Sequence, residues 1–394
     1  MSQINIRNLS NENDDGSPEI VGVSTFSATS FFVPPKGSTA ERPSDCDPGS
    51  IRFNTDTANL EYFRGNTIGW SQFELVNPNL GGGTGSNTGL GTRGVFGPGE
   101  APHGDTIDFL TISTFGDSTD FGNLTQSHGN GSSQGGCASR TRGIWLSGQL
   151  GTSPNYSNII QFVTFASIGN ASDFGDINSA RAAVGNLSNQ TRAMCFGGSL
   201  SDGSKPTQID AVTIASEGNA FDFGDMSTYV GNTANLASST RGIMAGGTIS
   251  PTRTNIIQFV TISTSGNTVD FGDLVDHGDG ASSLLYNGVG YSNSTRGIIH
   301  GGRDVNGNMN NLIQFITIAT TGNSSDFGDT AVSAMHQMGG SSPTRGVVGA
   351  GYNPSITNAM EFVNIMSLGN ASDFGDCTAR DEVLGGCSNG HGGL

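Results

Sequence analysis

The chain has 394 residues, of which 61 are glycine, while charged residues make up only 13%. Glycine is therefore about twice as frequent as usual, which argues against long helices because each interior glycine costs a helix about 1 kcal/mol relative to alanine. The net charge of −17, with only two lysines, argues against a nucleic-acid partner, since phosphate contacts need clustered Lys and Arg. No run of 18 apolar residues exists, so we expect no membrane insertion, and the polar N-terminus predicts no signal peptide.

Three segments precede the rest of the chain. Residues 1–20 are polar and acidic, which predicts a flexible N-terminus, and residues 21–76 contain strand patterns such as IRFN (51–54) and LEYF (60–63), which predict a small β-rich module. Residues 77–91, NPNLGGGTGSNTGLG, have the composition of a flexible linker. The remaining residues, 92–394, form the main domain.

The β-rich module carries a recognisable set of residues. STAERP (38–43) is followed by PGSIRFNTDT (48–57), then LEY (60–62) and Trp70. This set resembles a module of virion structural and tail-fibre proteins of tailed bacteriophages, in particular marine cyanophages, where it precedes glycine-rich repeats. The resemblance covers about residues 20–75. It implies that the protein is synthesised in the host cytoplasm, that its N-terminal module attaches it to other virion proteins, and that its final location is the virion. Trimers or hexamers would match the symmetry of virion appendages.

The main domain is built from an internal repeat. Asp-Phe-Gly recurs with a period of about 51 residues, and Thr-Arg followed by Gly or Ala recurs with a period of about 50. The Asp-Phe-Gly tripeptides begin at Asp120, Asp173, Asp222, Asp270, Asp326 and Asp373, and the arginines are Arg93, Arg142, Arg192, Arg241, Arg296 and Arg345. Two independent markers thus indicate six units.

Each unit predicts about four short antiparallel strands. The clearest strand is an alternating apolar segment, and Gly-Gly and Gly-Asn turns flank it. Its six copies are 107–112, 159–165, 209–214, 256–262, 312–318 and 359–365. Four strands in about 50 residues are typical of one blade of a kelch-class β-propeller.

The ends of the repeat array are offset. The first Thr-Arg precedes the first Asp-Phe-Gly, whereas the C-terminal GGCSNGHGGL follows the last Asp-Phe-Gly without a Thr-Arg. We therefore expect the tail to complete a unit with TRGVFGPG (92–99), giving an all-β, six-bladed propeller closed by its two termini, because closure removes exposed sheet edges. The alternative is an open β-solenoid, which would need capped ends.

The repeat resembles kelch propellers in its glycine pairs, such as Gly197-Gly198, Gly246-Gly247 and Gly301-Gly302, and in its recurring arginine. The usual kelch Trp is absent, and the phenylalanines of Asp-Phe-Gly lie near its place. The resemblance implies an interaction module as one alternative function.

The repeated Arg and Asp are the first candidates for a site. A ring of them around a channel could bind a carboxylate or a sugar, but a site seldom recurs in every repeat, so we expect each Arg to pair with a carboxylate or with backbone carbonyls within or between blades. The phenylalanines of the alternating segments are predicted to form the core between blades, although the third unit has Ala211 there. These phenylalanines are Phe109, Phe162, Phe259, Phe315 and Phe362.

Other chemistry is weakly indicated. Five scattered cysteines without a CxxC pair predict reduced thiols, and we expect no metal and no cofactor. Asp304, Asn306 and Asn308 match only the start of a calcium loop, so a hairpin loop is expected. The sequence has neither an HExxH nor a GxSxG motif, nor a phosphate-binding loop, and we expect no enzymatic activity. The acids that do not repeat could still supply a catalytic pair. They are Glu217, Asp276, Asp279, Asp304, Glu361, Asp381 and Glu382.

We therefore expect a non-enzymatic virion structural protein of the tail-fibre, spike or decoration type. Its propeller would present loops that vary in length and composition, for structural contacts or for contacts with a glycan or protein of the host surface. The alternatives are a glycan-degrading tailspike enzyme and a cellular kelch-like interaction module.

Overall fold

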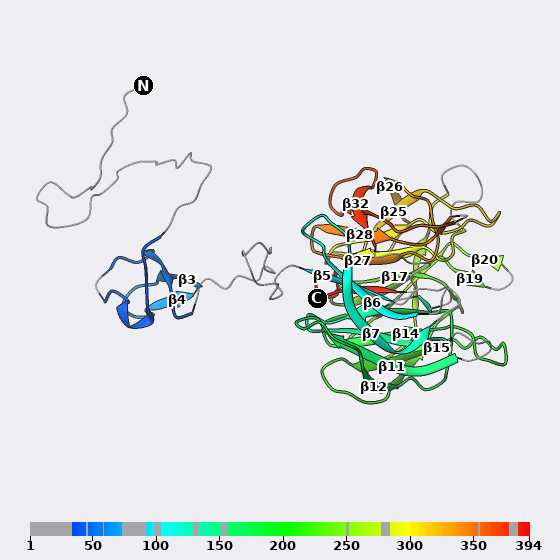
Figure 1. Cartoon of the computed structure of the whole chain (residues 1–394), viewed down its shortest axis with the longest axis horizontal. Helices are drawn as coiled ribbons and strands as arrows, with labels where there is room; N and C mark the ends of the chain where they lie inside the picture. Colours follow the sequence, from blue (N-terminus) through cyan, green and yellow to red (C-terminus); the bar gives the residue numbers. More distant parts are fainter. Residues whose placement is uncertain are drawn as a thin grey trace, which may run out of the picture. The chain divides into compact units, whose positions relative to one another are not determined.

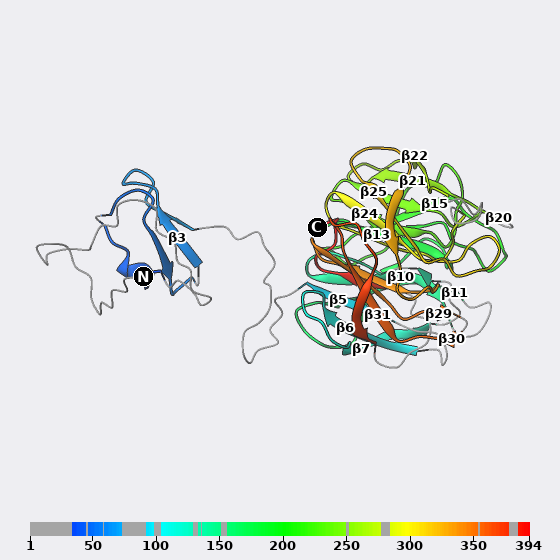
Figure 2. The ribbon, with the colours of Figure 1, turned by 90° about the horizontal axis from the view of Figure 1, so that it is seen from above.

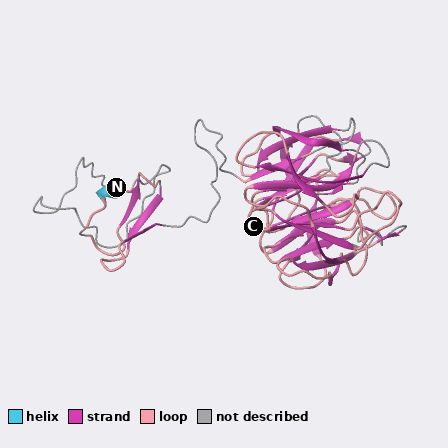
Figure 3. Cartoon of the chain, turned by 90° about the horizontal axis from the view of Figure 1, so that it is seen from below, coloured by secondary structure: helices cyan, strands magenta, loops and turns pink. Residues whose placement is uncertain are grey.

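The computed structural model describes residues 34–44, 46–57, 59–72, 92–97, 104–128, 133–134, 136–150, 156–249, 252–276, 284–353, 355–377 and 385–394. Their regular structure is all-β, as predicted, apart from one 3₁₀ helix at Thr39–Glu41 (Figure 3). The chain divides into two compact units, Met1–Asn77 and Pro78–Leu394. The predicted flexible N-terminus (1–20) and linker (77–91) lie outside the described residues.

The N-terminal unit contains one four-stranded sheet. Its strands are β1 (Lys36–Gly37), β2 (Ile51–Asn54), β3 (Asn59–Phe63) and β4 (Trp70–Gln72). Strand β1 pairs in parallel with β2, and the other pairs are antiparallel. The prediction of a small β-rich module agrees with this sheet.

The residues that carry the family resemblance meet at Glu61. Its buried carboxylate accepts hydrogen bonds from Arg42 Nη2 at 2.7 Å and from Asn54 Nδ2 at 3.1 Å, and Arg52 Nη1 lies at 3.5 Å. Burial alone would raise the pKa of Glu61, but the hydrogen bonds from Arg42 and Asn54 and the charges of both arginines hold the pKa below its usual value. The motif therefore encodes a buried charged cluster that fixes the segment around residue 42 on the sheet.

The described residues of the C-terminal unit form six sheets with four antiparallel strands each, one of which has a fifth strand, and we number them I to VI (Figures 1 and 2). Sheet I is β33 (Gly386–Ser388), β5 (Arg93–Phe96), β6 (Gly104–Thr111) and β7 (Thr119–His128). Sheet II is β9 (Gly136–Ala138), β10 (Arg142–Gln149), β11 (Tyr156–Thr164) and β12 (Ser172–Asp176). Sheet III is β13 (Val184–Ser188), β14 (Arg192–Phe196), β15 (Gln208–Thr213) and β16 (Phe221–Asp225), with β8 (Ser133–Gln134) added in parallel beside β13.

The other three sheets repeat this order. Sheet IV is β17 (Ala234–Ala237), β18 (Arg241–Ala245), β21 (Ile256–Thr261) and β22 (Val269–Asp273). Sheet V is β23 (Val289–Ser292), β24 (Arg296–His300), β25 (Leu312–Thr317) and β26 (Ser325–Asp329). Sheet VI is β27 (Met338–Ser341), β28 (Arg345–Gly349), β31 (Ala359–Asn364) and β32 (Ser372–Asp376). Two small hairpins, β19 (Thr248–Ile249) with β20 (Thr252–Arg253) and β29 (Tyr352–Asn353) with β30 (Ser355–Ile356), extend from sheets IV and VI.

The alternating segments form the third strand of each sheet, as their period-2 pattern predicts. The Asp-Phe-Gly tripeptide lies in the fourth strand, where the pairing with the third strand shifts by one residue. In sheet II this β-bulge lies between Ile160 and Gln161, opposite Gly175, whose φ of +144° favours glycine. The recurring glycine of this tripeptide is therefore explained by backbone geometry.

Sheet I joins the two ends of the C-terminal unit. Strand β33 near the C-terminus pairs antiparallel with β5, with Gly386 opposite Phe96 and Ser388 opposite Gly94. The predicted completion of the tail's unit by residues 92–99 is confirmed for residues 94–96, while residues 98 and 99 lie outside the described residues.

The hydrophobic core lies between neighbouring sheets. One cluster combines Ile144 and Ile160 of sheet II with Val184 and Val212 of sheet III. Equivalent clusters join I to II, III to IV, IV to V, V to VI and VI to I. The first strand of each sheet lies beside the first strands of its two neighbours, including β33 beside both β9 and β27.

Candidate functional site

The strand order gives the C-terminal unit two different ends. Because the strands of a sheet alternate in direction, the turn between the first and second strands lies at the same end as the hairpin between the third and fourth. We call this the hairpin end. The loops between the second and third strands, and the connections from one sheet to the next, lie at the opposite end, which we call the loop end.

The six repeat arginines lie at the hairpin end and bond to the neighbouring sheet. In each case Nη1 donates to the carbonyl of the residue that follows the third strand of the next sheet. The bonds are Arg93 to Phe165 (2.5 Å), Arg142 to Ile214 (2.9 Å), Arg192 to Ile262 (2.7 Å), Arg241 to Ile318 (2.9 Å), Arg296 to Ile365 (3.0 Å) and Arg345 to Ile112 (3.0 Å). The last bond joins sheet VI to sheet I, so all six sheets take part.

Each guanidinium also packs on an aromatic ring of its own sheet. The distance from Arg241 Cζ to the Phe259 ring centroid is 4.6 Å, and the equivalent distance is 4.4 Å for Arg296 over Phe315. The prediction that these phenylalanines form the core between sheets is confirmed in part. Phe109 is buried in the cluster between sheets I and II, and the other four are partly buried and pack against the equivalent clusters. The flat guanidinium therefore packs on a ring that also contacts the apolar core.

Sheet III has Ala211 at the position where the third strand of every other sheet has a phenylalanine. Ala211 lies opposite Phe221 across the β15–β16 pair, and Arg192 Cζ lies 5.8 Å from the Phe221 ring centroid. In sheet III the aromatic ring beside the arginine therefore belongs to the residue opposite Ala211 on the fourth strand.

The repeated aspartates do not face the arginines. Asp173 and Asp222 are exposed, and each carboxylate accepts a hydrogen bond at 3.2 Å from the backbone N–H of the glycine two residues later. Among the described residues, no ion pair joins a repeat Arg to a repeat Asp, and Glu217 is the carboxylate that pairs with Arg142, at 3.1 Å. The repeat arginines therefore bond to the neighbouring sheet, whereas these aspartates bond to the backbone of their own strand.

The Gly-Asn hairpins cover the exposed edge of the neighbouring fourth strand. Gly169 N donates to Phe121 O at 2.8 Å, and Asn170 Oδ1 accepts from Asn123 N at 3.1 Å. The same pair of bonds recurs at every seam between sheets, with Asp117 in place of asparagine between VI and I. An edge strand would otherwise offer free backbone groups to another chain.

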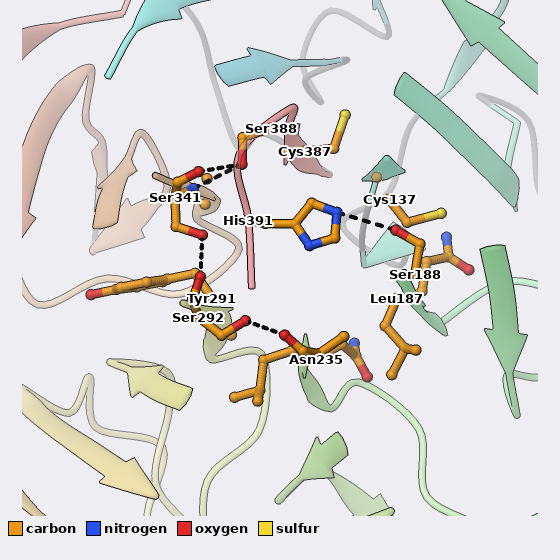
Figure 4. Close-up of a pocket in the computed structure, with 18 residues that line it drawn as sticks. Cys137, Leu187, Ser188, Asn235, Tyr291, Ser292, Ser341, Cys387, Ser388 and His391 are labelled. Atoms are coloured by element: carbon orange, nitrogen blue, oxygen red, sulfur yellow. Dashed lines mark hydrogen bonds between the residues drawn. The ribbon is translucent and has the colours of Figure 1, made fainter. Parts of the chain in front are cut away.

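A small cavity lies among the first strands of all six sheets (Figure 4). Its volume is about 50 Å³, enough for a few water molecules. Serine hydroxyls link the strands around it: Ser292 Oγ donates to Ala237 O at 2.7 Å, Ser341 Oγ to Ser292 O at 2.8 Å, and Ser388 Oγ to Ser341 O at 2.6 Å. The polar atoms of the wall therefore serve the contacts between sheets.

The C-terminal residues enter this cavity. Figure 4 shows the His391 ring pointing toward Ser188. His391 Nε2 lies 2.9 Å from Ala138 O, Nδ1 accepts from Gly393 N at 3.0 Å, and Gly392 N donates to Ser292 O at 2.9 Å. Burial lowers the pKa of His391 to about 4, although the bond to Ala138 raises it, so the ring is neutral at pH 7. The tail thus connects sheets II and V.

The other predicted site residues do not converge. Asp304 accepts from Asn308 N at 2.8 Å within a turn, as expected for a hairpin loop, and no metal-binding group of three His, Cys, Asp or Glu occurs among the described residues. Glu217 lies at the hairpin end, whereas Glu361 is buried in sheet VI, 2.8 Å from His300 Nε2. Asp279, Asp381 and Glu382 lie outside the described residues.

All five cysteines are free, and four of them are buried. Burial raises the pKa values of Cys195 and Cys387 to about 12, so neither is a thiolate near neutral pH.

The comparisons with known proteins add no name: no family model matches the chain, and neither does any curated protein. The part of the chain that the structure describes contains no helix with the length and apolar character of a membrane span.

The sequence interpretation missed the role of the central serines and of His391. A signal for the serines was present, because Ser188, Ser292 and Ser341 each lie four residues before a repeat arginine. No such signal was present for His391, because no other unit of the repeat has a histidine at the corresponding position.

Proposed function

We propose that this chain is a non-enzymatic virion structural protein of a tailed bacteriophage. In this proposal the N-terminal unit docks on the particle, and the six sheets are the blades of a closed, kelch-like propeller displayed for structural or host-surface contacts. Its partners would be other virion proteins and a glycan or protein of the host surface.

The observation that carries the proposal is the complete set of arginine–carbonyl bonds, ending with Arg345 to Ile112. An open array of six sheets would leave one arginine and one carbonyl without a partner, whereas a closed ring uses all of them. A ring joined at every seam is a rigid frame, and its loops can vary without loss of the frame.

Two further observations support a structural role. The residues of the resemblance converge on buried Glu61, which pairs with Arg42 and Arg52, so they serve the structure of the N-terminal unit. Three of the candidate carboxylates, Glu217, Asp304 and Glu361, serve local bonds in different sheets, which favours binding over hydrolysis.

Peptide mass spectrometry of density-purified particles of a phage that encodes this chain tests the proposal. We expect its peptides in stoichiometric amounts in intact virions, and gold-labelled antibody against the C-terminal unit on the particle surface. Peptides confined to the lysate, or release of reducing sugar from host envelope by the purified chain, would contradict the proposal.

A further inference from the structure

Apart from Arg181, which is buried and paired with Asp210, three described cations with no place in the repeat lie at the loop end. Lys205, Arg253 and Arg303 occupy the loops between the second and third strands of sheets III, IV and V, which are consecutive. This concentration is unexpected in a chain of net charge −17.

The cations pack on tyrosines of the neighbouring connection. Arg253 Cζ lies 4.0 Å from the Tyr286 ring centroid, and Arg303 Nη1 donates to Tyr286 Oη at 3.1 Å. One sheet away, Lys205 Nζ lies 5.9 Å from the Tyr229 ring centroid. Two guanidinium groups therefore converge on a single tyrosine, and a second cation–tyrosine pair lies at the same end of the unit.

The described residues provide no carboxylate partner for either guanidinium. Neither Arg253 nor Arg303 takes part in an ion pair among them, and Arg253 Nη1 is buried without a hydrogen bond. Asp304, next to Arg303, accepts from Asn308 N at 2.8 Å and from Asn308 Nδ2 at 3.1 Å. Like charges held together without a counter-ion are a favourable place for an external anion.

We propose that Arg253, Tyr286 and Arg303, extended by Lys205 and Tyr229, bind an acidic polysaccharide through its carboxylate groups. Guanidinium groups match the planar carboxylate, and tyrosines offer hydrogen bonds and apolar ring surface to sugars. The inference rests on the proposed function, in which this unit contacts a host surface, and it names the ligand class.

Isothermal titration of the full chain with hexagalacturonate, in 50 mM NaCl, tests the inference. We expect binding that is lost when the probe is fully methyl-esterified, because the ester removes the charge and keeps the sugar. Arg253→Gln and Arg303→Gln should each weaken binding about tenfold, as expected for the loss of one charge-assisted hydrogen-bonding group. Tyr286→Phe should weaken binding by a smaller factor, since it keeps the ring and removes the oxygen that orients Arg303.

Arg140→Gln is the matched control, because Arg140 is an exposed cation at the hairpin end and its loss changes the net charge equally. This variant should bind like the parent, and unchanged melting temperatures would show that all variants fold. Equal weakening in Arg140→Gln, undiminished binding of the methyl ester, or no binding of hexagalacturonate would overturn the inference. Binding of inorganic phosphate without binding of hexagalacturonate would also overturn it, by pointing to a phosphate-bearing ligand. Detection of the chain in virions is independent of these results, so the two proposals can fail separately.

Discussion

Mild acid should destabilise the C-terminal unit through His391. Its Nε2–H donates to Ala138 O at 2.9 Å, and its Nδ1 accepts from Gly393 N at 3.0 Å, so both nitrogens of the neutral ring are used. A proton on Nδ1 would break the bond from Gly393 and place a charge in a cavity whose lining holds no carboxylate. Protonation of His391 therefore destabilises the packing of the C-terminal residues in the cavity.

The size of the effect follows from the pKa difference. The pKa of His391 is about 4 in the folded chain and 6.5 when unperturbed. Between these two pH values, the histidine is therefore protonated in the unfolded chain and neutral in the folded chain. Stability must fall as the pH drops from about 6.5 towards 4, and the loss between pH 7 and pH 5 is about 2 kcal/mol.

Urea titration at pH 7 and pH 5 measures this loss. Trp145 is buried in sheet II, and a Trp70→Phe background makes it the sole tryptophan reporter. In His391→Gln the difference in unfolding free energy between the two pH values should be smaller by about 2 kcal/mol, because the carboxylates elsewhere titrate alike in both proteins. An equal pH dependence in both proteins, or a His391 pKa near 6.5 by NMR titration, would refute the reasoning.

Three further predictions concern packing in the C-terminal unit, each measured by the same urea titration at pH 7. Gly175→Ala should reduce the free energy of unfolding by about 2 kcal/mol, because its φ is +144° and an added Cβ would lie 2.5 Å from a backbone carbonyl of the next sheet. The control is Gly169→Ala, whose added Cβ meets nothing within 4 Å and which should change stability by less than about 0.5 kcal/mol. Asp210→Gln should reduce the free energy of unfolding by about 3 kcal/mol, because it leaves Arg181 buried without its counter-charge. Adding Arg181→Val should recover most of this loss, because the double variant has the residue types found at the same two positions of the next repeat. Arg241→Lys should cost about 1 kcal/mol, since it keeps the charge and loses the flat group that covers the ring. Equal losses for both glycine variants, a double variant no more stable than Asp210→Gln, or a neutral Arg241→Lys would each contradict the corresponding explanation.

Much of the fold was predictable because its signals are local. The alternating segment around Phe259 marks a third strand by its period of two, and the Gly-Asn turn that follows marks a hairpin through backbone preferences. The pairing of β33 with β5 was also predictable, because the offset between the markers showed which strands each end lacked. These features depend on residues near one another in the sequence or on counting repeats.

The contacts that join the sheets were decided only by the tertiary structure. The sequence marked Arg345 as a repeated residue, but only the fold brings it to the carbonyl of Ile112, 233 positions away. Phe221 replaces the ring missing at Ala211 because the two face each other across a strand pair. Likewise, the seat of His391 and the convergence of Arg253 and Arg303 on Tyr286 arise where separate segments meet. Repetition of local signals therefore determined the strands and turns, whereas side-chain partners between sheets depend on geometry that exists only once the chain has folded.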